Sequence, residues 1–369
     1  MSLAIVTGSN GLVGSETSIF LLEKGFDVVG IDNNERMKFF GLDGDTRRIK
    51  IFLKNKYSNY THYNCDIRNK EKINKIFKKY KKRVKFLLHA AAQPSHDWAY
   101  SNIRKDFEIN ATGTLNILEG AKNNFPDTVF IFTSTNKVYG DNPNRLNLIE
   151  KENRWTPPKN SKFYKGINET MTLDNCTHSL FGISKVYADL LVQEYNKNFG
   201  MKTACFRAGC ITGPNHSGAK LHGFLSFLVK ECLRKRSYQI IGYKGKQVRD
   251  NIHSKDLTQA FWNFYKRPIN NAVFNIGGAK YSNCSILEAI KYIEEKLNIK
   301  IKKKFLKKPR TGDHKWYVSD ISKFQKFYPN FKIRYNTEKI IDQILEDGGA
   351  KAQNISSKKV KKIKEMVGF

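Results

Sequence analysis

The first two hundred residues alternate short apolar runs, rich in β-branched side chains, with longer segments in which apolar positions recur every three or four residues. The short runs predict buried strands, and the longer segments predict amphipathic helices. Strands are predicted at 3–7, 27–31, 84–90, 128–134 and 203–207, and helices at 11–24, 107–123 and 184–199. Such alternation is typical of βαβ units, so we expect an α/β fold with a doubly wound parallel sheet and helices on both faces.

Beyond residue 208 the alternation becomes less regular. Loops rich in Gly, Pro and Asn separate helices predicted at 221–234, 256–265 and 285–297. We interpret residues 1–208 as one domain and residues 209–347 as a smaller α/β lobe, some of whose strands and helices return to the first domain. Residues 348–369 are rich in lysine and are predicted to form a solvated basic tail, although a weak amphipathic helix that binds a membrane or partner is an alternative.

The charge balance is strongly basic, with 65 Lys and Arg against 34 Asp and Glu, a formal net charge of +31. Only 15 of these basic residues are Arg, the residue whose guanidinium fork dominates phosphate and base recognition. We therefore expect no nucleic-acid partner, and a positive field that attracts a small anionic substrate. No apolar run approaches the ~20 residues that span a bilayer, which predicts no membrane association.

The chain starts directly on a predicted strand, with no charged segment before an apolar one, so we expect a cytoplasmic protein. The six cysteines lack the spacing of metal ligands and are predicted to be free thiols, and no metal site is expected.

Glycines 8, 11 and 14 lie between the first predicted strand and the first helix. Their spacing is typical of a Rossmann-type turn that holds a dinucleotide pyrophosphate at a helix N-terminus, although a glycine turn without a ligand is the alternative. Asp32 ends the next strand and is placed to accept hydrogen bonds from both adenosine ribose hydroxyls. A carboxylate there repels a 2′-phosphate and favours NAD over NADP, with nearby Arg36 as the one residue that would suit a phosphate.

Several further segments occur in a fixed order along residues 1–345. They are HAAAQ at 89–93, NATGT at 110–114, TSTNKVYG at 133–140 and RD at 249–250. Together with the glycine turn, they resemble the extended short-chain dehydrogenases/reductases that act on nucleotide sugars. Within that family, residues 134–141, 178–185 and 245–250 are similar to the CDP-tyvelose (CDP-paratose) 2-epimerases.

The resemblance implies NAD as cofactor and a nucleotide-diphosphate sugar as substrate, with a CDP-sugar favoured. It also implies a homodimer formed through the helices around 107–123 and 184–199. The cofactor contacts that it implies are Gly8, Asn10, Gly11, Leu12, Asp32, Asn33, Asp66, Ile67, Ala90, Ala91, Ala92, Asn110 and Lys185.

The family's chemistry uses a Ser or Thr, a Tyr, and a Lys four residues after the Tyr. Thr135 and Lys185 match the first and last, but Phe181 occupies the Tyr position, and a phenyl ring can neither accept nor return a proton. His96 is our first candidate to replace the phenol, because an imidazole with a pKa near 6.5 suits proton exchange and Asp97 could orient it. Lys185 itself could serve if partly desolvated, and weaker candidates are Tyr164, Cys176 and His178.

The resemblance further implies a set of substrate contacts. Arg249 and Arg310 match positions where family members bind the diphosphate, and a guanidinium fork suits two phosphates, although either could instead form a structural ion pair. The other implied contacts are Gln93, Asn136, Asn215 and His222.

We therefore expect an NAD-dependent nucleotide-sugar epimerase, similar to the CDP-paratose 2-epimerases, that works by transient oxidation to a keto sugar and hydride return. Two alternatives stay open: a dehydratase or oxidoreductase of the same family, and an NAD-binding regulatory protein without redox activity because of Phe181.

Overall fold

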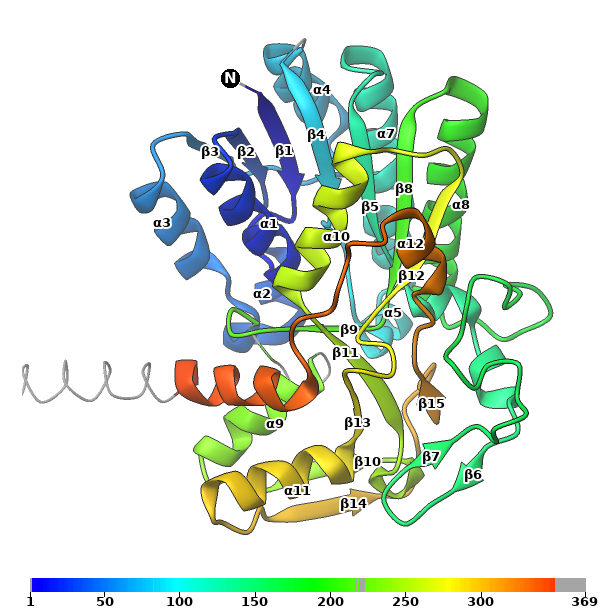
Figure 1. Ribbon diagram of the computed structural model, residues 1–369. Helices are drawn as coiled ribbons and strands as arrows, with labels where there is room; N and C mark the ends of the chain where they lie inside the picture. The colour runs from blue at the N-terminus through cyan, green and yellow to red at the C-terminus, as the bar shows by residue number, and fades with distance from the viewer. Residues whose placement is uncertain (1, 82, 217, 219–222, 349–369) are drawn as a thin grey trace, which may run out of the picture.

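The computed structural model describes residues 2–81, 83–216, 218 and 223–348 (Figure 1). Its central sheet has seven parallel strands in the order β12-β8-β5-β4-β1-β2-β3. The strands are β1 (Leu3–Thr7), β2 (Asp27–Ile31), β3 (Tyr60–Tyr63), β4 (Val84–His89), β5 (Val129–Thr135), β8 (Lys202–Ala208) and β12 (Ala272–Ile276). All five strands predicted from the apolar runs are present, with boundaries that agree within one residue.

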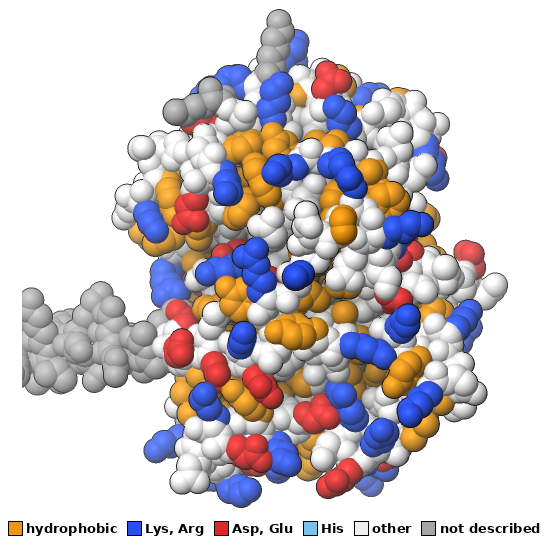
Figure 2. Space-filling model, in the orientation of Figure 1, with side chains coloured by type: hydrophobic (Ala, Val, Ile, Leu, Met, Phe, Trp, Pro, Cys, Tyr) orange, Lys and Arg blue, Asp and Glu red, His pale blue; other side chains and the backbone are white. Residues whose placement is uncertain are grey.

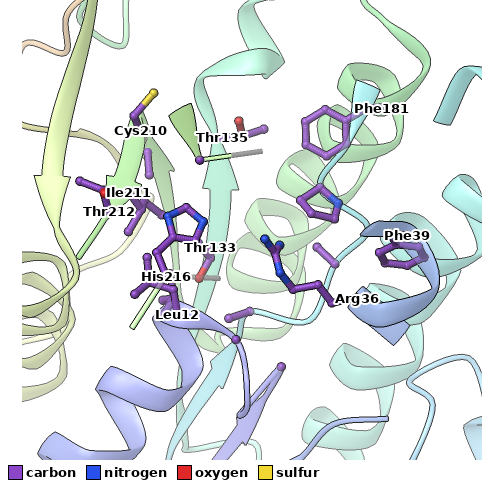
Figure 3. Close-up of a pocket in the computed structure, with 18 of the residues that line it drawn as sticks. Leu12, Arg36, Phe39, Thr133, Thr135, Phe181, Cys210, Ile211, Thr212 and His216 are labelled. Atoms are coloured by element: carbon purple, nitrogen blue, oxygen red, sulfur yellow. The ribbon is translucent and has the colours of Figure 1, made fainter. Parts of the chain in front are cut away.

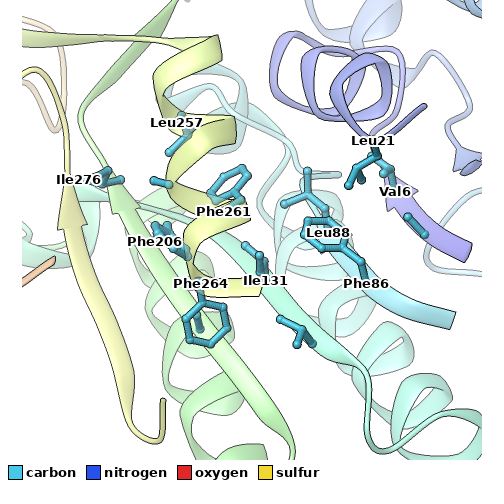
Figure 4. Close-up of a cluster of buried hydrophobic side chains, with 14 of the residues drawn as sticks. Val6, Leu21, Phe86, Leu88, Ile131, Phe206, Leu257, Phe261, Phe264 and Ile276 are labelled. Carbon is cyan, nitrogen blue, oxygen red and sulfur yellow. The ribbon is translucent and has the colours of Figure 1, made fainter. Parts of the chain in front are cut away.

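Both faces of this sheet are buried, which is why its strands have nearly continuous apolar sequences. In β1, Ala4 and Val6 face one hydrophobic cluster while Leu3 and Ile5 face the other. The first cluster is covered by α1 (Leu12–Glu23), α10 (Ser254–Lys266) and α12 (Ser322–Phe327), as Figure 4 shows in part. The second is covered by α4 (Lys70–Tyr80), α7 (Gly113–Asn124) and α8 (Leu180–Phe199). The predicted Rossmann-type, doubly wound fold is confirmed.

The helix predicted over residues 107–123 is not one continuous α-helix. It consists of the end of α6 (Ile103–Phe107), a π-helical turn at Glu108–Thr112, and α7. The Asn110 side chain lies in that turn and hydrogen-bonds the backbone of the loop after β4. Because a π turn accommodates one extra residue, it lets Asn110 face this loop while the helix continues.

Shorter helices connect the strands before β5. They are α2 (Glu35–Phe40), α3 (Arg47–Lys56) and α5 (His96–Ser101), with a 3₁₀ turn at Gly41–Gly44. After β5 come two 3₁₀ turns, Asn136–Tyr139 and Asn142–Arg145, and a hairpin of β6 (Ile149–Glu150) and β7 (Trp155–Thr156).

The remaining elements form a lobe below the carboxyl ends of the sheet strands (Figure 1). Its larger sheet contains β9 (Cys210–Thr212), β11 (Val248–His253), β13 (Asn283–Ser285) and β15 (Trp316–Tyr317), and its smaller sheet pairs β10 (Tyr238–Ile241) with β14 (Lys303–Leu306). The helices α9 (Phe224–Leu233), α11 (Ile286–Leu297) and one at 337–348 enclose a third apolar cluster. By contrast, α10 and β12 belong to the layers of the first domain, because α10 packs on α1 and β12 pairs with β8.

On one face of the molecule, basic side chains are spread out rather than gathered in one stripe (Figure 2). On the face shown in Figure 2, Lys and Arg alternate with acidic and apolar side chains. Within the described part of the chain, no helix has both the length and the apolar character needed to cross a membrane. The predicted tail at 348–369 lies outside the described residues except for Gly348.

Candidate active site

A cavity of about 580 Å³ opens at the carboxyl ends of the sheet strands and continues into the lobe (Figure 3). Its sheet side is formed by the loops after β1, β2, β4 and β5, and its lobe side by β9, β10, β11 and residues 310–313. The strand order changes direction between β1 and β4, and the crevice at such a point is where doubly wound sheets bind ligands. The cavity therefore joins the predicted cofactor turn to the predicted substrate lobe.

The glycine turn forms one wall of this cavity. Gly8 has φ +69°, and a Cβ added there would lie 2.7 Å from the backbone nitrogen of Ala91, so only glycine permits this approach to the loop after β4. Gly11 is the N-cap of α1 and provides no side-chain cap for the N–H groups of the first turn. These N–H groups are left for an anion at the positive end of the helix. The buried Oδ1 of Asn10 also lacks a hydrogen-bond partner in the structure.

Asp32 follows β2 and lines the same wall. Its carboxylate accepts the backbone N–H of Asn10 at 3.1 Å and that of Asn34 at 2.7 Å, which fixes its position beside the glycine turn. Burial raises the pKa of Asp32, and the two backbone hydrogen bonds act in the opposite direction. The open helix end, the unpartnered Asn10 oxygen and this carboxylate fit the pyrophosphate and ribose of NAD.

Most of the other predicted cofactor residues line the cavity, but Asn110 does not. Leu12, Asn33, Asp66, Ile67, Ala90, Ala91, Ala92 and Lys185 are among the lining residues. Asn33 donates to the carboxylate of Asp66 at 3.2 Å, and Arg68 pairs with that carboxylate. Asn110 is buried and hydrogen-bonds Gln93, Asp106 and Ser184, so it fixes the loop after β4 rather than facing the cavity.

Thr135, Phe181 and Lys185 all line the cavity. Thr135 is the last residue of β5, while Phe181 and Lys185 lie one turn apart on α8. The Lys185 Nζ donates to the Thr133 carbonyl at 3.0 Å and lies 4.1 Å from the centroid of the Phe132 ring. Burial lowers the pKa of Lys185 to about 8. The geometry thus brings together the two matching residues and places an apolar ring where the phenol would be.

His96 lies beside Phe181, with 4.9 Å between ring centroids, but the environment differs from the one the sequence suggested. Burial, with Lys137 and Arg310 nearby, lowers the pKa of His96 to about 3 rather than leaving it near 6.5. Its Nδ1 is 2.7 Å from the Ser179 hydroxyl. The expected orienting role of Asp97 is also wrong, because that carboxylate binds Arg310 at 2.7 Å. A neutral imidazole with so low a pKa is a poor base.

Arg249 and Arg310 both line the cavity, and each is paired with a carboxylate. Arg249 donates to Asp313, and Arg310 donates to Asp97 through Nε and Nη2. Although burial raises the pKa of Asp313, Arg249 and Lys137 hold it at about 2. The sequence neighbour Asp250 is not the partner of Arg249.

Asp250 has a structural role in the lobe. It is buried, accepts the backbone N–H of Ser319 at 2.9 Å, and lies so close to Gly209 and Gly277 that neither position has room for a side chain.

The remaining predicted residues divide between the cavity and other places. Asn136 and Asn215 line it, and His222 lies outside the described residues. Gln93 is buried and donates to the Ser95 carbonyl and to Asp106, so the expectation that it contacts substrate is not supported. The weaker candidates for the base, Tyr164, Cys176 and His178, do not line the cavity.

Three basic residues that line the cavity were not among the predicted site residues: Arg36, Lys137 and His216. Arg36 and His216 extend into the cavity from opposite sides (Figure 3). Arg36 stacks on Phe40 at 4.7 Å, and burial lowers its pKa to about 10. The sequence contained a signal that could have identified Lys137 as a site residue. It lies two residues after Thr135, within the motif at 133–140.

Comparison with known proteins identifies the family. Residues 4–277 match the sequence model of the family described as NAD dependent epimerase/dehydratase. The chain belongs to this family. It is 31% identical over 327 residues to a CDP-paratose 2-epimerase of Salmonella typhi, a match that covers 86% of this chain and 91% of that protein. The predicted family, an enzyme acting on a nucleotide sugar, and NAD as its cofactor are confirmed.

Other members of the NAD-dependent epimerase/dehydratase family are also similar. A dTDP-D-glucose 4,6-dehydratase of Dictyostelium discoideum is 28% identical over 273 residues, which covers 74% of this chain and 57% of that protein. The fold matches that of a UDP-glucuronic acid 4-epimerase from Bacillus cereus, solved with UDP-glucuronic acid and NAD. Its TM-score is 0.74 at 22% identity, covering 94% of this chain and 99% of that one. These relatives are named for two kinds of reaction, epimerisation and dehydration, and for sugars that carry different nucleotides.

Proposed function

We propose that this enzyme inverts one carbon of a CDP-sugar by transient oxidation and hydride return, as in a CDP-paratose 2-epimerase. The observation that supports it most is the single cavity that joins the glycine turn and Asp32 to Thr135, Lys185 and the two lobe arginines. The 31% identity to a CDP-paratose 2-epimerase favours a CDP-sugar over the UDP-sugars of other relatives.

Bound NAD supplies the hydride acceptor and donor of the reaction. The glycine turn and Asp32 hold its pyrophosphate and adenosine ribose, and Lys185 holds the nicotinamide ribose. Thr135 donates or accepts a hydrogen bond at the sugar hydroxyl that is oxidised. His96, neutral at physiological pH, contributes a hydrogen bond to the sugar rather than acting as its base.

Arg249 and Arg310 bind the diphosphate in this proposal. Each guanidinium now pairs with its own carboxylate, Asp313 or Asp97, and the oxygens of a diphosphate offer a similar bidentate acceptor with more charge. The two pairs keep both guanidinium groups oriented toward the cavity before substrate arrives.

The predicted homodimer used the helices around 107–123 and 184–199, and we further propose that its interface is formed by α5, α6 and α8. Their outer faces expose large apolar side chains that a single chain leaves in contact with solvent. These are Tyr100, Ile103, Phe107, Ile183, Tyr187, Leu190 and Phe199, each at least 41% exposed.

A panel of substrates tests the proposed reaction. The purified enzyme with its NAD is incubated with CDP-paratose, UDP-glucuronate and dTDP-glucose, and products are followed by ¹H NMR. Appearance of the C2 epimer of CDP-paratose supports the proposal. A 4-keto-6-deoxy product from dTDP-glucose would instead indicate a dehydratase. Bound NAD with no conversion of any sugar would favour the alternative of an NAD-binding regulatory protein without redox activity.

A further inference from the structure

Lys137 lies on the turn that follows strand β5. It lies two residues after Thr135, in the 3₁₀ turn Asn136–Tyr139, and its half-buried side chain lines the cavity. Its backbone N–H donates to the Thr135 hydroxyl oxygen at 3.3 Å. The same turn therefore fixes the Thr135 hydroxyl and places an amine in the cavity.

Two uncharged acceptors hold the Lys137 amine. The Nζ donates to the Gly312 carbonyl at 2.9 Å and lies 3.4 Å from Nδ1 of His314. His314 Nε2 is 2.8 Å from the Gly140 carbonyl, which can only accept, so Nε2 carries the proton. The His314 Nδ1 is then a bare acceptor that faces Lys137.

This arrangement suits a group that gives and takes one proton. An ammonium has three N–H bonds, of which Gly312 and His314 accept two. A neutral amine keeps two N–H bonds for the same acceptors and presents its lone pair where the third N–H was. Lys137 can therefore change protonation state without losing either contact. The N–H bond that it loses or regains is the third one, which neither Gly312 nor His314 accepts.

Burial and the charges around Lys137 leave the ammonium as the main form at pH 7 and give the neutral amine a population of about a tenth. Among the described residues, no carboxylate lies within 4.0 Å of its Nζ, and Asp313 is already bound to Arg249. Burial lowers the pKa of Lys137 to about 8, with Asp313 acting against the arginines. The ionisable groups that face it come from β9, β11, α5 and the 310–314 segment: Cys210, Arg249, His96, Arg310, Asp313 and His314.

We propose that Lys137 is the acid–base residue of this enzyme, in place of the phenol that Phe181 removes. The assignment rests on the proposed epimerase function. As the sugar carbon gives up its hydride, its O–H bond breaks and a C=O bond forms, and the neutral Lys137 amine accepts that proton to become an ammonium. When the hydride returns, the ammonium gives the proton back to the oxygen, so the step leaves Lys137 unchanged.

The other candidates are less suited to this role. The Lys185 ammonium donates to the Thr133 carbonyl and lies over the Phe132 ring, and deprotonation would lose the attraction to that ring. His96 has too low a pKa to hold a proton during turnover.

Turnover of Lys137 variants provides the first test. We expect Lys137→Met to lower kcat about 10²- to 10⁴-fold, the usual contribution of a positioned acid–base group, while CDP affinity measured by calorimetry changes little. Lys137→Arg should be equally impaired, because a guanidinium keeps the charge but does not release its proton. Lys280→Met, at an exposed lysine over Tyr164 and outside the cavity, is the control with wild-type turnover.

Restoring the phenol provides a complementary variant. Phe181→Tyr should increase the turnover of the Lys137→Met enzyme, because the new hydroxyl lies beside Lys185 and can take over the proton. In the wild-type background the same change should give no gain. If Lys137→Met or Lys137→Arg keeps wild-type turnover, the Lys137 assignment alone is overturned. A wild-type enzyme that inverts no sugar overturns the proposed function and the assignment together.

A measurement independent of turnover completes the test. Acetylation of Lys137 by acetic anhydride is followed against pH by peptide mass spectrometry, with N-acetyl-lysine amide as internal standard. We expect a midpoint near pH 8 rather than the 10.5 of an ordinary lysine, and slower labelling when CDP is bound. A midpoint at or above 10 would show that Lys137 stays fully protonated at neutral pH and would overturn the proposal.

Discussion

At the residue scale, we expect Asp32 to decide between NAD and NADP. Its carboxylate is fixed by two backbone N–H groups and lies in the cavity beside the glycine turn. Hydrogen bonds to a charged group contribute about 1.5–3 kcal/mol. We therefore expect Asp32→Ala to weaken NAD binding about 10- to 100-fold in a fluorescence titration. Asp127→Ala, at an exposed position, is the matched control. Tighter binding of NADP than NAD by the wild-type protein would contradict this prediction.

Residue types and motif positions were sufficient to predict which segments surround the cavity, but not where every side chain points. Gln93 and Asn110 belong to matching motifs, yet both turn into one buried hydrogen-bond network with Asp106. Arg249 pairs with Asp313, 64 residues away, rather than with its neighbour Asp250. The low pKa of His96 likewise depends on Lys137 and Arg310, which only the fold brings near. These outcomes depend on tertiary partners that no local pattern contains.

At the element scale, the strands of the central sheet were predicted well because burial on both faces makes them continuous apolar runs. The helices were predicted less well at their ends. The predicted helix at 184–199 begins four residues earlier, at Leu180, because the Ser179 side chain caps it by accepting the Gly182 N–H. The π turn before α7 could not be predicted, since it depends on a contact between Asn110 and a loop seventeen residues away.

The outer faces of α6 and α8 lead to a prediction about assembly. Phe107 and Tyr187 pack together with ring centroids 5.8 Å apart and are 45% and 41% exposed. A charge at the centre of such an apolar interface would be desolvated without a partner, which is strongly unfavourable. We expect Tyr187→Asp to convert a dimer into a monomer at micromolar concentration, as measured by light scattering. Phe305→Asp, at a 53% exposed residue on β14, should leave the dimer intact. A monomeric wild-type protein would refute the interface.

At the scale of the whole molecule, the cavity is assembled from segments that are far apart in the sequence. Gly8 and Asp32 come from the first strands, Thr135 from the middle of the chain, and Arg310 from near its end. The chain reaches this arrangement because α10 and β12 return to the first domain, and the lobe segments that precede α10 and follow β12 are thereby held at the sheet. The family pattern predicted residues on the sheet side and on the lobe side of the cavity. The Arg–Asp pairs and the contacts of Lys137 that connect the two sides could be found only from the structure.

The desolvation of several histidines in the folded protein predicts how its stability depends on pH. His89 is buried and His96 and His216 are half-buried in the folded protein, and desolvation lowers the pKa of each to about 3, against 6.5 for an ordinary histidine. Between these values the unfolded chain binds more protons than the folded protein, so the free energy of unfolding decreases as the pH falls from 6.5. Each such histidine contributes about 1.4 kcal/mol per pH unit in this range.

Asp250 acts in the opposite direction, because burial raises its pKa from 3.8 to about 6 and the folded protein then holds its proton longer than the unfolded chain. The three histidines together outweigh Asp250. We expect the free energy of unfolding in urea, at a fixed saturating NAD concentration, to be about 2–4 kcal/mol lower at pH 5 than at pH 6.5. Potentiometry should show net proton uptake on unfolding at pH 5. Proton release there, or equal stability at the two pH values, would mean that these imidazoles are not held neutral by the fold.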